Sequence, residues 1–259
     1  MADPLISVLM PFHGACPTLA GSVASVRAQS RGDWELILIN DGAAFETVAR
    51  AEALAAQEPR IHLVQTGVGP GAGLGSGLGA AGARNAGLAV ARGRYIAFLD
   101  ADDRWHPEKL ARQMTFMAER SAVLSHTSYA RVTPQGEVLS EVRARPELRY
   151  ADMLGPNPLG CLTVIYDRAH FGDQPMPDLP LQHDYALWLR LMRGGAVAHG
   201  LDEVLAEYRV ASGSLSSNKL KAVRDILRVW LREEGLGLGV TLGALGRYVR
   251  HSLRHRVGR

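Results

Sequence analysis

The first hundred residues alternate between short apolar runs and segments with helical character, and this alternation limits the possible folds more than any other feature. Four runs predict strands: 6–10 (ISVLM), 34–40 (WELILIN), 61–65 (IHLVQ) and 94–100 (RYIAFLD). They are apolar throughout instead of alternating with polar residues, as expected of strands whose two faces are both covered. The pattern predicts an α/β fold, with right-handed βαβ units around a mostly parallel central sheet flanked by helices.

Three helices are predicted between these strands, and a mixed pattern follows residue 103. The predicted helices span 17–29, 45–57 and 80–91, and the later elements are a helix at 106–120, a hairpin of strands at 122–132 and 137–142, a strand at 161–167 and a helix at 184–195. We therefore expect one domain over 1–217. Its nucleotide-binding half would end at about residue 103. Its second half (104–217) would shape the site of the molecule that reacts with the nucleotide ligand, and a helical tail would follow at 218–259.

Composition and targeting signals suggest a cytosolic globular protein. The chain has 259 residues, of which 47% are hydrophobic and 21% charged. Its two cysteines, Cys16 and Cys161, are too few for a disulfide framework. The first apolar run has no basic region before it, unlike a secretory signal. No stretch approaches the roughly 18 apolar residues that a membrane-spanning helix needs.

The formal charge of +3 is unevenly distributed. Residues 218–259 contain ten Lys and Arg against three acids, a net charge of +7, so the rest of the chain carries −4. A basic tail favours an anionic surface, either membrane or nucleic acid. Aromatic residues make up only 6% of the chain and no nucleic-acid-binding motif is present, so we expect no nucleic-acid partner.

Within the tail, apolar residues recur at helical spacing and basic residues fall on the other side. The apolar positions are Leu238, Leu242, Leu245, Val249 and Leu253. This pattern is typical of a basic helix at a membrane interface, here over 238–256. A stripe that packs on the body of the protein or on a second subunit would look the same, so both alternatives stay open.

Three carboxylates follow the strand at 94–100, in the stretch YIAFLDADDRW. Residues two apart in a strand point to the same side, so Asp100 and Asp102 could reach one divalent cation. Oxygen ligands suit Mg²⁺ or Mn²⁺, which often share their ligands with a diphosphate. The alternative is a solvated turn in which Asp103 caps the next helix.

Two further carboxylates stand at positions suited to a ligand site. Asp41 ends the strand at 34–40, where it could accept hydrogen bonds from a nucleobase or a ribose, although Asp-Gly is also a common turn. Asp184 opens an amphipathic helix, and a helix N-terminus favours an ionised carboxylate. Such a group could act as a general base. Its alternative role is a helix-terminal charge that serves only stability.

The stretch GVGPGAGLGSGLGAAG (67–82) is rich in glycine and contains a G-x-G-x-x-G match at Gly77, Gly79 and Gly82. A dinucleotide-binding fingerprint would directly follow the first strand of its unit, whereas this match lies after the third strand and a long loop. We expect either a flap over the ligand or a plain loop insertion, and not a dinucleotide-binding dehydrogenase.

Taken in order, these motifs closely resemble glycosyltransferase family 2, the inverting enzymes of the GT-A fold. The matching segments are the strand that ends at Pro11, the turn at 41–42, ARNAGLAVARGRYIAFLDADD (83–103), QHDYALWLRL (182–191) and EYRVASGSLS (207–216). The resemblance covers residues 5 to 217, and the segment 83–103 is the most specific part. It implies a GT-A nucleotide-diphospho-sugar transferase fold.

The resemblance implies a donor side and a metal site. Asp41 would contact the nucleobase of a nucleotide-sugar, most often UDP. The other donor-binding residues would be Pro11, Phe12, His13, Arg84, Asn85, Asp100, Ala101 and Asp102. Asp100 and Asp102 would form the metal-binding Asp-x-Asp motif, with Asp102 as the direct ligand of Mn²⁺ or Mg²⁺.

The resemblance also implies the chemistry. Asp184 would be the single catalytic base, and His183, Trp188 and Arg209 would contact the acceptor or support the catalytic residues. Expulsion of a nucleoside diphosphate is stabilised by a divalent metal, and one carboxylate suffices to deprotonate an acceptor hydroxyl. Without an enzyme nucleophile, the hydroxyl attacks opposite the leaving group and the anomeric centre inverts.

This chain departs from the family pattern at several positions. Asn40 stands where the family usually has an Asp, Ala43 and Ala44 replace small polar residues, and His183 replaces the acidic residue that commonly precedes the base. The glycine loop is also longer than usual. The Gln-x-x-Arg-Trp motif of processive synthases is absent, so we expect transfer of a single hexosyl unit in cell-surface or lipid-linked glycan synthesis, in the cytoplasm or peripherally at the inner face of the membrane.

Two other functions compete with this one. A sugar nucleotidyltransferase also uses a sheet-end metal carboxylate, but its G-x-G-T-R-L entry is absent after the first strand, where PFHGACPTL stands. A non-catalytic nucleotide-binding or glycan-binding module on the same fold is the second alternative, and the presence of Asp100, Asp102 and Asp184 argues against it.

Overall fold

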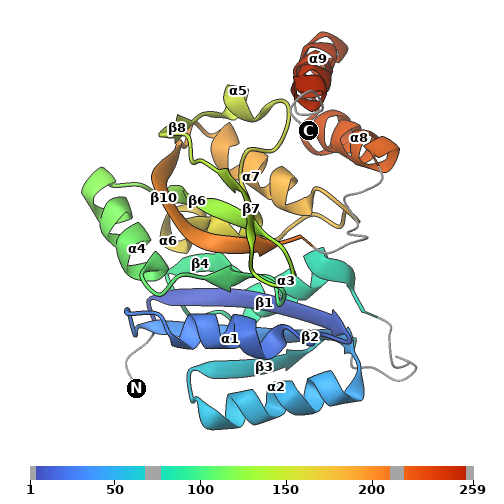
Figure 1. The fold of residues 1–259 in the computed structure, drawn as a ribbon. Coiled ribbons are helices and arrows are strands. Elements are labelled where there is room, and N and C mark those ends of the chain that lie inside the picture. Colours follow the sequence, from blue (N-terminus) through green and yellow to red (C-terminus); the bar gives the residue numbers. More distant parts are fainter. Residues whose placement is uncertain (1–3, 68–76, 211–218, 255–259) are drawn as a thin grey trace.

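The computed structural model describes residues 4–67, 77–210 and 219–254 (Figure 1). The strands are β1 (Ile6–Gly14), β2 (Trp34–Ala43), β3 (Ile61–Gln65), β4 (Tyr95–Phe98), β5 (Arg104–Trp105), β6 (Leu124–Val132), β7 (Val138–Val142), β8 (Glu147–Leu148), β9 (Ile165–Asp167) and β10 (Ala198–Arg209). The helices are α1 (Leu19–Arg27), α2 (Phe45–Gln57), α3 (Gly79–Val90), α4 (Lys109–Arg120), α5 (Tyr150–Met153), α6 (Arg168–Phe171), α7 (His183–Arg193), α8 (Lys219–Arg228) and α9 (Leu238–Arg254), with a short 3-10 turn, η1 (Cys161–Thr163), and a π-helical turn, η3 (Val229–Glu233).

One mixed sheet runs through the whole domain, and helices flank it, as predicted. Its strand order is β3-β2-β1-β4-β9-β6-β10-β5, with β7 paired to β6 and β8 to β10. The strands β3, β2, β1 and β4 are parallel, whereas β9 is antiparallel to both β4 and β6. The strand β9 therefore joins the nucleotide-binding half predicted from the sequence to the second half.

Two apolar cores, one on each face of the sheet, explain why the first strands are apolar throughout. Leu9 and Ile37 point into the core that contains α3 and α7. Their neighbours Val8 and Leu36 point into the core that contains α1 and α4. Because successive side chains of a strand face opposite ways, a strand between two cores must be apolar at every position.

The structure corrects several predicted boundaries. The strand β1 continues past Pro11 to Gly14. It pairs with β4 only over Ile6 to Leu9, so the missing N–H of Pro11 falls where that neighbour has ended. The predicted strand at 161–167 is instead the η1 turn followed by a short β9. The strand β10 was not predicted, although it pairs with β6 over much of its length.

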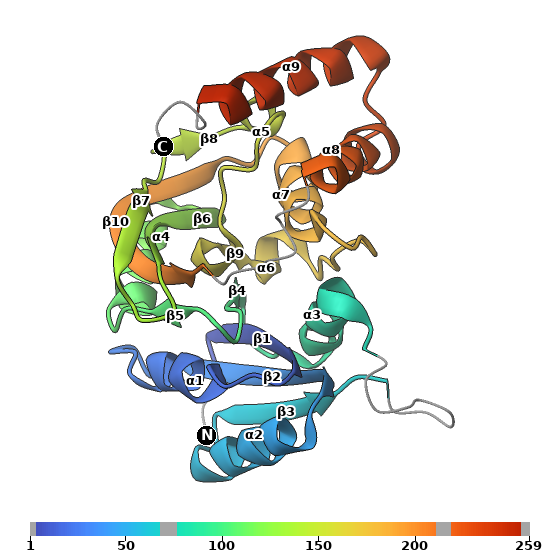
Figure 2. The same cartoon turned by 45° about the vertical axis from the view of Figure 1, so that its right-hand side comes forward.

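The C-terminal helices pack on the same core as α7. Ile226, Val229 and Trp230 are buried in it, together with Ala244 of α9. Figure 2 shows α8 and α9 beside α7, at the end of the molecule opposite α2. None of the described helices is both long and apolar enough to cross a bilayer.

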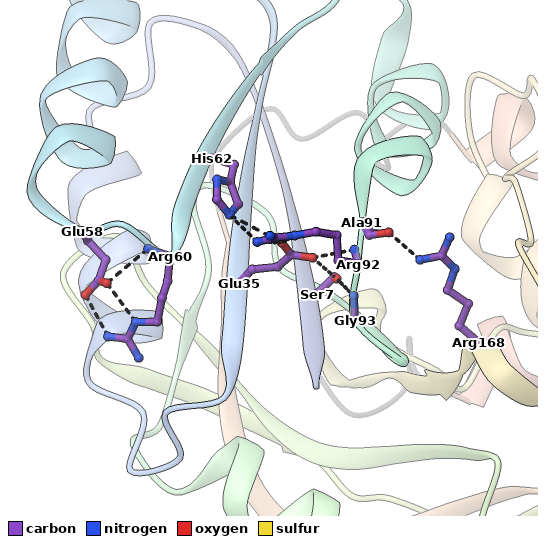
Figure 3. A network of polar contacts seen from close by, with 9 residues as sticks. All are labelled: Ser7, Glu35, Glu58, Arg60, His62, Ala91, Arg92, Gly93 and Arg168. Carbon is purple, nitrogen blue, oxygen red and sulfur yellow. Dashed lines mark hydrogen bonds and ion pairs between the residues drawn. The ribbon is translucent and has the colours of Figure 1, made fainter. Parts of the chain in front are cut away.

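A buried carboxylate, that of Glu35, joins the N-terminal ends of the parallel strands, opposite the strand ends that carry the candidate site (Figure 3). Glu35 at the start of β2 accepts hydrogen bonds from Ser7 Oγ at 2.6 Å and from the Arg92 backbone N–H at 2.7 Å. The Arg92 guanidinium also lies 2.9 Å from Glu35 Oε2. Burial opposes ionisation, but these donors outweigh it and lower the pKa of Glu35. The network joins β1, β2 and the turn before β4.

We expect Glu35→Gln to lower the free energy of unfolding by about 2 kcal/mol at pH 7, because the buried donors lose a charged acceptor. The matched control is Glu141→Gln, which breaks a half-exposed pair with Arg143 and should cost less than about 0.5 kcal/mol. Urea unfolding of both variants measures the difference.

The effect should depend on pH. The folded pKa of Glu35 lies below its ordinary value of 4.5, so the ionised carboxylate stabilises the fold above that pH and the stabilisation is lost as pH falls through the folded pKa. The gap between wild type and Glu35→Gln should therefore be full at pH 7 and narrow below about pH 4.5. A gap that stayed constant down to pH 3 would show that the charge is not what stabilises the network.

Candidate functional site

The carboxyl ends of three parallel strands meet at one edge of the sheet. His13 lies at the end of β1, Asp41 at the end of β2 and Asp100 directly after β4. The strands are adjacent, and the His13 Nδ1 atom lies 2.5 Å from the backbone carbonyl oxygen of Asp41. Ligands of open α/β sheets bind at such strand ends, so the predicted donor residues converge on a plausible place.

The Asp41 side chain is held by neighbours that the sequence did not reveal. Its Oδ1 accepts hydrogen bonds from Thr66 Oγ1 at 2.6 Å and from the Leu78 backbone N–H at 2.7 Å. A Cβ added to Gly77 would lie 2.5 Å from the Asp41 carbonyl oxygen, so the chain can approach here only as glycine. Thr66 directly follows β3, and its place at the next strand end could have identified it.

The end of the glycine-rich stretch therefore packs on Asp41. The rest of that stretch, residues 68–76, lies outside the described residues, and so does most of the predicted flap. The helix α3 begins at Gly79, which has a φ of +76°. A backbone in this left-handed region favours glycine, which accounts for one of the three glycines in the motif.

The side-chain amide of Asn40, which stands where the sequence resemblance would place an Asp, makes two structural hydrogen bonds. Its Nδ2 donates to Gln65 Oε1 at 2.5 Å, and its Oδ1 accepts the Ala43 backbone N–H at 2.8 Å. One group thus donates across to β3 and accepts within its own turn, and an ionised carboxylate cannot donate. Asn40 therefore closes the turn that presents Asp41.

The turn after β4 is fixed from three directions. The Asp103 N–H donates to the Asp100 carbonyl oxygen at 3.1 Å, and Ser22 Oγ of α1 donates to the Ala101 carbonyl oxygen at 2.9 Å. The buried Asp103 carboxylate accepts the Arg209 backbone N–H at 2.9 Å, which joins the turn to the end of β10. The alternative that Asp103 caps the next helix is wrong, because α4 begins only at Lys109 after an N-cap at Glu108.

The electrostatics of this turn favour a cation. Asp102 is exposed at the surface, yet its pKa is raised, because the surrounding protein excludes part of its solvent and the Asp100 carboxylate lies nearby. Burial and the charges of Asp100 and Asp102 likewise raise the pKa of Asp103. The positive charge of Arg209 lowers the pKa at both Asp102 and Asp103 and so opposes this shift.

A divalent metal is compatible with these residues. Among the residues that the structure describes, no three or more His, Cys, Asp or Glu side chains form a complete metal cluster. Two neighbouring carboxylates, here Asp100 and Asp102, are nevertheless the protein share of a typical Mg²⁺ or Mn²⁺ site, which is completed by water and substrate phosphates.

Arg84 of α3 connects this turn to the predicted base. Its guanidinium is buried and forms an ion pair with Asp100, and its Nη1 lies 2.8 Å from His183 Nε2. Burial disfavours the charge on Arg84, but nearby Asp100 and Asp184 raise its pKa overall. Arg84 can only donate, so His183 Nε2 accepts, and the other ring nitrogen donates to the Leu179 carbonyl oxygen at 3.2 Å. Burial and the Arg84 charge lower the pKa of His183, in agreement with a neutral ring.

Asp184 lies in the first turn of α7, partly exposed and near this network. The helix begins after Gln182, whose φ of +63° is unusual for a residue with a side chain. Burial raises the pKa of the Cys161 thiol, the charges of Asp100 and Asp184 add to the rise and Arg84 opposes it, so Cys161 lies close to the same residues. Sequence reasoning did not identify it, since a lone cysteine gives no signal.

Asn85 contacts the second half of the protein directly. Its Nδ2 donates to the Met176 carbonyl oxygen at 2.8 Å, and its Oδ1 accepts the Met176 N–H at 2.7 Å. Met176 belongs to the proline-rich segment that leads to α7. The predicted donor-side pair thus holds the second half at two points, Asn85 at Met176 and Arg84 at His183, the first residue of α7.

Two predicted residues, Phe12 and Trp188, lie differently from what their roles suggested. Phe12 is buried in the core with α1, whereas Pro11 is partly exposed and His13 exposed. Trp188 is fully buried and packs edge to face on Phe98, with ring centroids 5.6 Å apart. It leaves no surface for an acceptor and supports the site only by packing.

Known proteins resemble this chain over most of its length. It is 37% identical over 98% of both chains to the putative teichuronic acid biosynthesis glycosyltransferase TuaG of Bacillus subtilis. It is 32% identical, over 89% of this chain and 85% of the other, to the UDP-Glc:alpha-D-GlcNAc-diphosphoundecaprenol beta-1,3-glucosyltransferase WfgD of Escherichia coli.

Solved structures share the fold at low sequence identity. The structure of S. aureus TarS 1–349 in complex with UDP-GlcNAc matches with a TM-score of 0.71 and 17% identity, over 94% of this chain and 71% of that one. The mannosyltransferase PcManGT from Pyrobaculum calidifontis, in complex with GDP-Man and Mn²⁺, matches with a TM-score of 0.67 and 14% identity, over 91% and 65% of the two chains.

These likenesses agree with the predicted GT-A type of fold. A model of the family described as glycosyl transferase family 2 matches residues 7–162, more than half of the chain. The matched range includes Asp41, Arg84 and the Asp100–Asp102 turn. The chain therefore belongs to glycosyl transferase family 2 and is a glycosyltransferase.

Proposed function

We propose that this enzyme moves one sugar from a nucleotide-sugar, specifically a UDP-sugar, to a hydroxyl of a lipid-linked acceptor, with inversion at the anomeric centre and with Mn²⁺ or Mg²⁺. The observation that carries the proposal is the Arg84 link. It brings the Asp100 carboxylate at the end of β4 next to the start of α7, which bears Asp184. A leaving-group site and a base are therefore held in one place.

Each residue then has a chemical task. Asp41 would bind the nucleoside together with Pro11 and His13 at the end of β1, and Asp100 and Asp102 would hold the metal. When bound, the metal would offset the charge of the departing nucleoside diphosphate. Asp184 Oδ would accept the proton of the attacking hydroxyl. His183 Nε2 is occupied by Arg84, so the neighbouring Asp184 is the better candidate for the base.

The names of the relatives support a cell-surface or lipid-linked product. TuaG is named for teichuronic acid biosynthesis, and WfgD for a diphosphoundecaprenol acceptor. We extend this class of acceptor to the present chain, and we place its reaction in the cytoplasm at the inner face of the membrane.

Asn85 would serve the donor site and the acceptor site indirectly, by holding the segment before α7. In Asn85→Ala the Met176 N–H loses its acceptor, so we expect its amide to exchange at least about tenfold faster, measured by hydrogen exchange with mass spectrometry. The control is Asn157→Ala, which frees the Leu159 N–H instead. Unchanged exchange at Met176 in Asn85→Ala would contradict the role.

Donor binding is tested by thermal unfolding with UDP, GDP and their sugars, each with and without Mn²⁺. A ligand at 100 times its Kd adds about 2.7 kcal/mol to the stability. We expect a Mn²⁺-dependent rise in Tm with UDP or a UDP-sugar that disappears in Asp102→Ala and persists in Asp33→Ala, whose carboxylate pairs with Arg31 before β2. A shift with GDP alone would change the donor, and no shift with any nucleotide would favour a non-catalytic module.

Asp184→Asn tests the base, because the amide keeps the size of the side chain but accepts no proton. We expect kcat to fall about 10²–10⁴-fold, with donor affinity changed less than twofold. Steady-state kinetics and donor titration provide the two numbers. Asp178→Asn changes an exposed carboxylate six positions earlier and should leave both numbers unchanged. Full turnover in Asp184→Asn would rule out this residue as the base.

A further inference from the structure

The orientation of α9 on the body of the protein is fixed by one of its faces. Thr241 and Ala244 are buried, and Leu245 and Tyr248 pack against the core that also contains α7. Arg247 Nε donates to the Leu154 carbonyl oxygen at 2.7 Å. The helix therefore packs on the body of the protein, which is one of the alternatives that the sequence left open for the tail.

Of the apolar stripe that the sequence pattern suggested, Leu245 belongs to this packing face, whereas Leu238 is 75% exposed, Leu242 67% and Val249 45%. The spacing of four and seven residues places the three exposed side chains on one side of the helix. Single exposed apolar side chains are ordinary, but three in a line on one helix form an apolar strip that has no partner among the described residues.

The charge around this strip is more positive than the composition implies. Two of the three acids in the tail are turned inward: Asp225 is buried, and Glu234 is engaged by Tyr150 at 2.7 Å and Arg193 at 2.7 Å. Arginines remain outside; the exposed ones are Arg224, Arg228, Arg232, Arg247 and Arg250. The helices α8 and α9 and the turn η3 thus carry exposed basic groups as well as exposed apolar ones.

We propose that this surface, which comprises Leu238, Leu242, Val249 and the exposed arginines of α8, η3 and α9, docks on a lipid bilayer that contains anionic lipids. Such a bilayer offers apolar and anionic partners side by side, as an interfacial helix requires. A second copy of the chain would instead place one basic surface against another. The surface itself consists of this chain's own residues and does not depend on the proposed function. The purpose of docking rests on the proposed lipid-linked acceptor.

The surface is also connected to the catalytic helix. Trp230 of η3 is fully buried, and its Nε1 donates to the Tyr185 hydroxyl at 2.8 Å. Tyr185 directly follows Asp184 in α7, and its hydroxyl donates to the Met153 carbonyl oxygen at 2.7 Å. Docking would therefore hold Asp184, the proposed base, at a fixed distance from the membrane surface, where an acceptor anchored by its lipid could reach it.

Vesicle co-sedimentation tests the proposal without nucleotide or acceptor, so its failure and the failure of the proposed transferase reaction are separate results. The probes are phosphatidylcholine vesicles with and without phosphatidylglycerol. We expect the full chain to bind the anionic vesicles, more weakly at high salt, and Leu238→Glu with Leu242→Glu to reduce binding at least about tenfold. Both positions are exposed, so the variant should keep its Tm.

The matched control is Val138→Glu with Leu139→Glu, an apolar pair on β7 that is 65% and 56% exposed. It should bind vesicles like wild type. Equal loss in both double variants would overturn the proposal, and so would no binding of the wild-type chain to anionic vesicles. A wild-type dimer that the tail variant converts to a monomer, in the absence of vesicle binding, would assign the strip to a second copy instead.

Discussion

The buried guanidinium of Arg84 is the interaction on which the site depends. A charge removed from water must be paired, and its partners here come from opposite halves of the chain, Asp100 after β4 and His183 at the start of α7. The pairing sets the position of the Asp100–Asp102 turn relative to the start of α7. Asn85, the residue after Arg84, binds Met176, so α3 holds both that turn and the segment that leads to α7.

The sheet gives this pairing a rigid frame. Its two faces are both covered, so α3 and α7 lie in one core while α1 and α4 lie in the other. The antiparallel strand β9 joins β4 to β6 and makes the two halves one continuous sheet. The C-terminal helices add a third support, because Trp230 reaches Tyr185 in the helix that carries Asp184.

The sequence predicted an element correctly where the residues of that element carry the pattern themselves. The helix at 45–57 and the strand at 61–65 were predicted with correct limits, since the pattern of each lies within its own residues. The strand β10 was missed because it carries acids that look like loop residues. Their charges are matched by distant partners: Asp202 lies 2.8 Å from Arg143 and Glu203 lies 2.7 Å from Arg112. Those pairs exist only after folding.

The sequence alone determined the class of fold and the family, because strand polarity, strand-end carboxylates and the motif in 83–103 are properties of short segments. It also identified the residues Asp41, Asp100, Asp102 and Asp184 as candidates. Only the tertiary structure decided which side chains meet: that Arg84 joins Asp100 to His183, that Trp188 is core, and that α9 packs through Ala244 and leaves Leu238 exposed. The physical reason is that burial and ion pairing depend on contacts between segments far apart in the chain, which local periodicity does not encode.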